Sequence, residues 1–259
     1  MTIGDPGCSL RDAPGSAPPN DGLKQEERVP TEIVVHCTNG IKESMIELTP
    51  AFERAHDAKV RVTFGSTKVI LEEIEAGAPA DLLILTAEAI DDLIRRGRIA
   101  SGSRVDIAKS GIGVAVRAGA PHPDIGTPEA LRRALLAAKT VGYSKVGASG
   151  IYAANELIPR LGLTEEMKTR AVLSMPGTSV GILIADGRAE IGLQQISELV
   201  PVPGIDVVGP LPSELQKMTT FSAGVAAGTK AAATARALAD NLASPAALPA
   251  MRRQGLEPA

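Results

Sequence analysis

The sequence predicts an α/β fold of two lobes with a cleft between them. From residue 31 onward, short runs rich in β-branched residues alternate with amphipathic segments, which is the pattern of a parallel sheet covered by helices. The chain has 259 residues, enough for two compact units with separate cores. A longer extended segment at 107–116, followed by a loop with three prolines, interrupts the alternation, so a second unit begins after them.

The first unit alternates strands and helices three times. Apolar residues such as Met45 and Phe52 recur at helical spacing across 41–56. Gly77 and Gly97 end the next two helices, because glycine readily adopts the left-handed conformation that follows many helix C-termini. The predicted strands are 33–37, 59–64 and 81–85, and the predicted helices are 41–56, 69–76 and 87–96.

The second unit follows the proline-containing loop, after which the chain returns to the first. Helices are predicted at 129–139, 152–161 and 180–186, and strands at 140–143, 171–173 and 190–193. Extended segments at 205–208 and 218–226 and a helical end at 230–253 complete the pattern. We therefore assign a flexible tail to residues 1–30, lobe 1 to 31–115 and 205–259, and an inserted lobe 2 to 116–204.

The composition excludes several kinds of partner. The net charge is −3 and aromatic residues make up 2% of the chain, which argues against the basic surface and stacking platforms of nucleic-acid-binding proteins. No segment reaches the roughly 18 uninterrupted apolar residues of a membrane helix. No glycine-rich nucleotide fingerprint or P-loop occurs, and the histidines and cysteines lack metal-ligand spacing. We expect no cofactor, no metal and a small-molecule ligand.

The first 30 residues bear on localisation. They lack the apolar run of about 7–15 residues that marks a secretory signal peptide. Charged residues interrupt each short apolar stretch, and Pro and Gly recur. The sequence as given therefore predicts a cytoplasmic protein, whereas a different start codon that encoded a signal peptide would place the protein in the periplasm.

Four strand-to-helix junctions carry small residues with hydroxyl or amide groups. Ligands of open parallel sheets bind at the carboxyl ends of the strands, where helix N-termini present unpaired N–H groups and a partial positive charge. Because Ser, Thr and Asn are also ordinary helix caps, capping alone explains a single junction. Four junctions divided between two lobes favour a cleft for an anion. The junctions are Thr38-Asn39-Gly40, Gly65-Ser66-Thr67-Lys68, Ala148-Ser149-Gly150 and Pro176-Gly177-Thr178-Ser179.

Two segments resemble the molybdate-binding proteins of ABC importers. The first is PAFERAHDAKVRVTFGSTKVILEEIEAGAPADLLILTAEAIDDLIRRGRI (50–99), in which a strand leads into a Gly-Ser loop and EAGAPAD opens the next strand. The second is the closing segment LPAMRRQGLEPA (248–259). The resemblance extends over residues 31–259 and implies a periplasmic-binding-protein-like (type II) fold, with the ligand in the cleft between the lobes.

The resemblance also implies which residues bind the ligand. Those that correspond to the family's hydroxyl and N–H donors are Thr38, Gly65-Ser66, Ser149-Gly150 and, in place of a late site tyrosine, Gln195. This chain departs from the family where Asn39 and Lys68 flank the first two loops and where Gln194 precedes Gln195. Since an ammonium group with amide donors suits carboxylates as well as oxyanions, these departures favour an organic acid over molybdate.

A later segment resembles a subgroup of this family that includes the bacterial aconitate isomerases. It reads QQISEL at 194–199 and continues as PVPGID at 201–206. The resemblance implies an isomerase that moves an allylic proton on an unsaturated tricarboxylate of the cis- or trans-aconitate type. The alternative is a non-catalytic binding protein for a carboxylate or a molybdate-like oxyanion, whose partner would be an ABC permease.

An allylic proton shift needs donors for the carboxylates and one group that accepts and returns a proton. An imidazole such as His36 changes charge near neutrality, Lys68 would serve if burial favoured its neutral form, and Tyr152 would relay a proton. Each of the three also has a plain interpretation as a packed or solvated side chain. The candidate ligand-binding residues are Thr38, Asn39, Ser66, Thr67, Lys68, Ser149, Gly150, Ser179 and Gln195.

Overall fold

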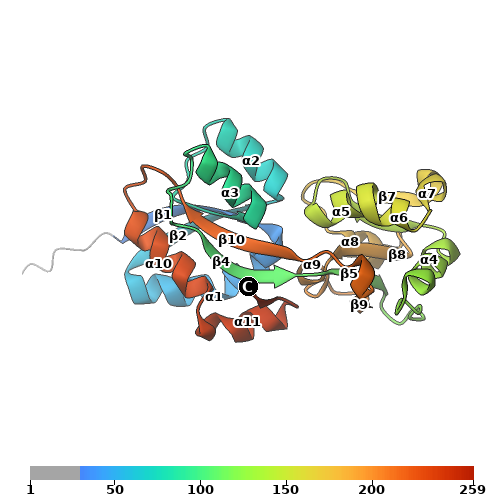
Figure 1. The fold of residues 1–259 in the computed structure, drawn as a ribbon. Helices are drawn as coiled ribbons and strands as arrows, with labels where there is room; N and C mark the ends of the chain where they lie inside the picture. Colours follow the sequence, from blue (N-terminus) through green and yellow to red (C-terminus); the bar gives the residue numbers. More distant parts are fainter. Residues whose placement is uncertain (1–29) are drawn as a thin grey trace, which may run out of the picture.

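The computed structural model describes residues 30–259, which form two lobes that lie side by side (Figure 1). One lobe is built on a six-stranded sheet and the other on a five-stranded sheet. The predicted two-lobed α/β fold is therefore confirmed. The predicted tail, apart from residue 30, lies outside the described residues.

Lobe 1 combines parallel and antiparallel strands. Its strands are β1 (Thr31–Thr38), β2 (Ala58–Gly65), β3 (Leu82–Thr86), β4 (Val105–Ser110), β10 (Thr219–Val225) and β11 (Glu257–Pro258), in the sheet order β11-β4-β10-β3-β1-β2. Its helices are α1 (Lys42–His56), α2 (Thr67–Glu75), α3 (Ala87–Arg95), α10 (Ala232–Leu242) and α11 (Leu248–Arg253), and a 3-10 turn, η1 (Asn39–Ile41), precedes α1. Strands β1, β2 and β3 run parallel, and β10 runs antiparallel to β3 and β4.

The sheet of lobe 1 has a core on each face, because successive strand residues point to opposite sides. Val35 and Ile84 pack in one apolar cluster with residues of α1, α10 and α11. Leu83 and Leu85 pack in the other with residues of α2 and α3. Figure 1 shows these two groups of helices on opposite faces of the sheet. The arrangement fixes the strand ends between the two helical layers.

Lobe 2 repeats the α/β arrangement. Its strands are β5 (Ile112–Arg117), β6 (Val141–Ser144), β7 (Ala171–Ser174), β8 (Ile191–Gln195) and β9 (Ile205–Pro210), in the sheet order β7-β6-β8-β5-β9. Its helices are α4 (Pro128–Ala137), α5 (Ala148–Tyr152), α6 (Ile158–Arg160), α7 (Thr164–Arg170), α8 (Val180–Ala185) and α9 (Ile196–Leu199), with a π-helical turn at Ala153–Leu157. The sequence did not predict α7 or α9, and the predicted helix at 152–161 begins earlier, at Ala148.

The lobe boundaries differ from the predicted ones. Strand β5 pairs with β8 and β9, so residues 112–117 and 205–210 both belong to the sheet of lobe 2. The chain crosses between the lobes at Gly111 and again between β9 and β10. The predicted boundaries assigned 112–115 and 205–210 to lobe 1. The sequence shows 107–116 as one extended segment, whereas the structure divides it into two strands of different sheets.

The helices of residues 30–259 are short. The longest, α1, has 15 residues. Within this range, no helix combines the length and the apolar character needed to cross a bilayer.

Candidate functional site

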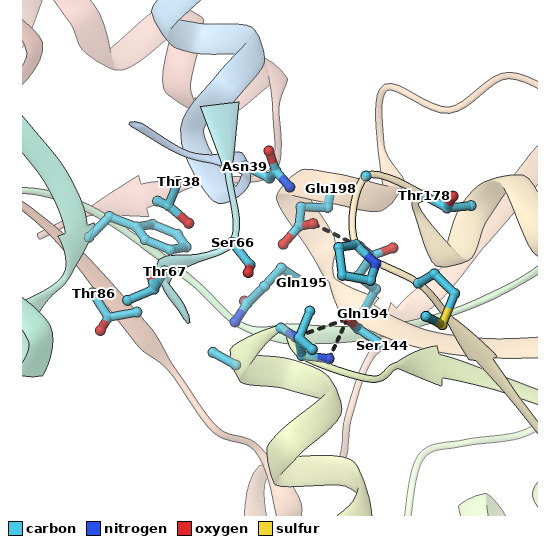
Figure 2. Close-up of a pocket in the computed structure, with 17 residues that line it drawn as sticks. Thr38, Asn39, Ser66, Thr67, Thr86, Ser144, Thr178, Gln194, Gln195 and Glu198 are labelled. Carbon is cyan, nitrogen blue, oxygen red and sulfur yellow. Dashed lines mark hydrogen bonds between the residues drawn. The ribbon is translucent and has the colours of Figure 1, made fainter. Parts of the chain in front are cut away.

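A cavity lies between the two lobes, at the carboxyl ends of their parallel strands (Figure 2). We call it the inter-lobe cavity; it holds about 540 Å³ of empty space, counting its open mouth. From lobe 1 its lining is Thr38, Asn39, Ser66, Thr67, Thr86 and Phe221. From lobe 2 its lining is Ser144, Val146, Gly147, Ala148, Met175, Pro176, Gly177, Thr178, Gln194, Gln195 and Glu198. Most of the polar lining groups are hydroxyls and amides.

The lobe 1 wall is made by three neighbouring strand ends. Thr38 ends β1, Ser66 follows β2 and Thr86 ends β3, and each is followed by a helical turn. The Ser66 hydroxyl caps α2 by accepting from Val69 N at 3.3 Å. The hydroxyls of Thr38 and Thr86 form no cap with the turns that follow them, so both are available to a ligand. Three helical N-termini here favour a bound anion.

The lobe 2 wall begins with the turn between β6 and α5. The Ser144 hydroxyl accepts from Gly147 N at 2.9 Å and holds this turn closed. Helix α5 packs so closely on the end of β6 that a Cβ on Gly150 would come within 1.8 Å of the Ser144 carbonyl oxygen. Gly147 and Ala148 lie in the cavity wall, whereas Ser149 and Gly150 are buried and do not line it.

Gln195 ties the floor of the cavity to both chain crossings. Its amide lies 2.7 Å from the Thr219 hydroxyl at the start of β10. With the amide oxygen accepting from Thr219, the nitrogen donates to the carbonyl oxygens of Ser110 at 3.0 Å and Gly111 at 3.2 Å. Gln195 is buried and lines the cavity. Its side chain therefore links the ligand site to the two segments that connect the lobes.

Gln194 and Glu198 form a second polar group in the cavity. Gln194 was noted from the sequence only as the neighbour of Gln195, and Glu198 was not predicted as a site residue. The Gln194 oxygen accepts from Val180 N at 2.9 Å and from the Ser179 hydroxyl at 2.9 Å. The Gln194 nitrogen donates to Glu198 Oε2 at 2.7 Å. Burial raises the pKa of Glu198 to about 7, against the opposing effect of this hydrogen bond. Gln194 lies in a strand and Glu198 in the helix that follows, so neither helical nor strand spacing in QQISEL would have paired them.

A groove continues outward from the cavity. This outer groove shares Asn39, Ser66, Pro176, Gly177, Thr178 and Glu198 with the cavity and adds Lys42, Glu43, Phe64, Gly65, Val69, Ser179, Ile182, Ser197, Pro201, Val202 and Pro203. None of the described residues that line the cavity itself is basic. Lys42 is the ammonium group of the groove, with its Nζ atom 3.8 Å from Glu43 Oε1. An anion in the cavity would thus be held mainly by neutral donors, with a cation at the mouth.

The structure brings together only part of the predicted ligand set. The predicted residues that line the inter-lobe cavity are Thr38, Asn39, Ser66, Thr67 and Gln195, and Ser179 lines the outer groove. Lys68 lies outside both; its side chain is 59% exposed and its Nζ atom is 3.9 Å from Glu72. Lys68 is the second residue of α2 and lies on the outer face of that helix, beside Glu72 one turn later.

The other two predicted proton carriers also lie outside the cavity lining. His36 is covered by α2 and by the segment before β3, with Nε2 3.0 Å from the Pro79 carbonyl oxygen and Nδ1 3.4 Å from Glu73. Tyr152 is buried in the core of lobe 2, and its hydroxyl donates to the Leu215 carbonyl oxygen at 2.8 Å. The geometry gives both residues structural contacts.

Comparison with known proteins agrees with the fold and the site. Residues 33–257 match the family model described as bacterial extracellular solute-binding protein. The chain is 38% identical over 233 residues to aconitate isomerase from Pseudomonas sp, covering 88% of each chain. It is 23% identical over 201 residues to the molybdate-binding protein ModA of Escherichia coli K12, covering 76% of this chain and 78% of that protein.

A solved structure shares the two-lobed fold. The periplasmic molybdate-binding protein of Azotobacter vinelandii superposes with a TM-score of 0.71 at 18% identity, covering 87% of this chain and 98% of that one. The family model alone spans nearly all of the described residues. The chain therefore belongs to the bacterial extracellular solute-binding proteins, in the molybdate-binding-protein-like group that includes aconitate isomerases.

Proposed function

We propose that this protein isomerises aconitate, or a closely similar unsaturated tricarboxylate, by moving an allylic proton. The observation that carries the proposal is the 38% identity to an aconitate isomerase over 88% of both chains. The cavity supports it, because its donors suit an anion and its outer groove leaves room for a ligand longer than a compact oxyanion.

The binding part of the proposal follows from the two walls. A carboxylate at the lobe 1 wall would accept from the hydroxyls of Thr38 and Thr86 and from the N–H groups that start α2 and α3. A second carboxylate would face the turn after Ser144. A third would extend into the outer groove, where Lys42 supplies the positive charge that we expected from Lys68.

The chemical part is a 1,3-proton shift that balances within the substrate. A C–H bond breaks at the CH₂ carbon, and its electron pair becomes the new C=C bond. The electron pair of the former C=C bond takes a proton at the carbon on the other side. Substrate and product contain the same atoms, so the reaction needs one protein group that holds the proton in transit.

A direct assay tests this proposal. Purified protein is mixed with cis-aconitate, and trans-aconitate is followed by proton NMR; the reverse reaction is started from trans-aconitate. We expect both reactions to reach the same final ratio, and we expect both acids to raise Tm by mass action.

The same measurement of Tm with molybdate distinguishes the isomerase from the alternative, a binding protein. The similarity to a molybdate-binding protein supports that alternative. If molybdate raises Tm while neither aconitate is converted, the protein is a binding protein and the isomerase proposal is wrong.

A further inference from the structure

We infer that Glu198 is the group that holds the allylic proton in transit, and that Gln194 positions it. This inference rests on the proposed isomerase function and names the residue that would perform its chemical step. From the sequence, Gln194 was noted only as a departure from the family pattern, and Glu198 was not a candidate.

Glu198 lies on α9, between the two lobes. Helix α9 packs against β5, β8 and β9 of lobe 2 and also against η1 of lobe 1, so it lies where the lobes meet. Glu198 lines both the inter-lobe cavity and the outer groove. Figure 2 shows its carboxyl group on the side of the cavity near Asn39 and Ser66. A ligand that reaches from the cavity into the groove must pass this carboxyl group.

A hydrogen bond from Gln194 fixes the orientation of the Glu198 carboxyl group. The Gln194 oxygen accepts from the backbone N–H of Val180, which can only donate, so the amide of Gln194 must present its N–H to Glu198. This fixes Oε2, whereas Oε1 has no hydrogen-bond partner among residues 30–259. One carboxyl oxygen is therefore held and the other is left for the ligand.

The chemistry of a carboxyl group fits the step. An ionised Glu198 would take the proton from the CH₂ carbon, forming an O–H bond as the C–H bond breaks. The neutral acid would then return that proton to the far carbon of the allylic system, which restores the carboxylate. Atoms and charge balance, and the acid needs only to reach the two terminal carbons of one planar system.

The surroundings leave few competitors for this role. Among the described residues that line the cavity, none except Glu198 has a carboxyl, imidazole or amine side chain. In the outer groove the other such groups are Lys42 and Glu43, which face each other at 3.8 Å. Burial raises the pKa of Glu198 to about 7, so near neutral pH the free protein contains both its protonated and its ionised form. Acid–base catalysis needs both forms.

The test is Glu198→Gln, which retains the shape of the side chain and an oxygen that accepts from Gln194. The matched control is Glu156→Gln, an exposed glutamate at the turn after α5. We expect Glu198→Gln to lower kcat by about 10²–10⁴-fold while it binds cis-aconitate within a few-fold of wild type, measured by calorimetry. Retained binding also shows that the variant is folded. The control should match wild type.

The outcomes separate the two proposals. If wild type converts aconitate and Glu198→Gln does so within threefold, Glu198 is not the carrier and the isomerase function stands. If wild type converts neither aconitate, both proposals are wrong. Should Glu198→Gln fail to bind, Glu198→Asp decides instead: it keeps the acid but withdraws it by one methylene, so a kcat unchanged from wild type would contradict the inference.

The positioning role of Gln194 has its own readout. Gln194→Glu keeps an oxygen for Val180 but places a second carboxyl group beside Glu198, which makes ionisation of the pair harder. We expect the acidic limb of the kcat/KM profile to move to higher pH by more than about one unit. An unmoved limb would show that Gln194 does not act through Glu198.

Discussion

Gln194 donates to Glu198 across 2.7 Å, a hydrogen bond that joins the end of β8 to α9. The same amide is anchored by Val180, at the start of α8. Three elements of lobe 2 therefore converge on one carboxyl group, and that group faces lobe 1 through α9. Such convergence gives the carboxyl group a defined direction, which a flexible surface glutamate lacks. It also makes the ionisation of Glu198 visible in the stability of the protein.

The first prediction concerns stability against pH. The pKa of Glu198 is raised from 4.5 to about 7 in the folded protein, so between these values the folded state keeps a proton that the unfolded state has lost. The contribution of Glu198 to the free energy of unfolding should therefore be largest below about pH 4.5 and fall by up to about 3 kcal/mol as pH rises to 7. Glu198→Gln removes this fall.

Urea unfolding of wild type and Glu198→Gln at pH 4.5 and pH 8 measures the effect. The difference between the two proteins cancels the contributions of carboxyl groups whose pKa values are lowered, such as Asp106 beside Arg104. We expect similar stabilities at pH 4.5 and a more stable variant at pH 8. A wild-type protein that gains on the variant as pH rises would show that the carboxyl group is stabilised in its ionised form.

The second prediction compares two lysines. Lys42 lies in the outer groove, whereas Lys68 lies on the outer face of α2. Because the Lys42 side chain is itself 44% exposed, its contact with a carboxylate is worth under about 1 kcal/mol. Lys42→Ala should raise KM for cis-aconitate about threefold to fivefold with little change in kcat. If Lys68→Ala raised KM more than Lys42→Ala does, Lys68 would be the lysine that contacts the substrate, as the sequence suggested.

The sequence was a good guide to the parts of the site that depend on local order. Thr38 and Ser66 end parallel strands, and parallel strands bring their carboxyl ends to one edge of a sheet. Glu198 could not be placed this way, because α9 has four residues and its contact with η1 exists only once the lobes are assembled. Tyr152 was misleading because its partner, Leu215, lies 63 residues further along the chain, in the core of the same lobe. Gly111 separates β4 from β5. The apolar residues on both sides of it continue one extended pattern, so the pattern does not show that the chain changes sheets there.

The third prediction assigns Tyr152 a structural role. Its buried hydroxyl donates to the Leu215 carbonyl oxygen, so Tyr152→Phe leaves that oxygen without its donor. The expected cost is about 1–2 kcal/mol in the free energy of unfolding. The kcat of the folded variant should stay within threefold of wild type. A large loss of kcat with unchanged stability would instead support Tyr152 as a proton relay.

The last prediction concerns the close approach of α5 to β6. A methyl group on Gly150 would lie 1.8 Å from the Ser144 carbonyl oxygen, and that oxygen belongs to backbone that cannot move aside alone. Gly150→Ala must therefore push α5 away from the turn at 144–148, which is part of the cavity wall. We expect a loss of more than about 2 kcal/mol in the free energy of unfolding, together with weaker binding of cis-aconitate.

Gly126→Ala is the matched control for this variant. Its added Cβ would meet Asp124 Oδ1 at 3.4 Å, an ordinary contact, and the residue lies outside the cavity lining. Urea unfolding gives the stability of both variants, and calorimetry gives their affinity for cis-aconitate. If Gly150→Ala is as stable as Gly126→Ala and binds as tightly, α5 can shift without cost. In that case the turn at 144–148 does not depend on the packing of α5 for its shape, and the lobe 2 wall is less rigid than its contacts indicate.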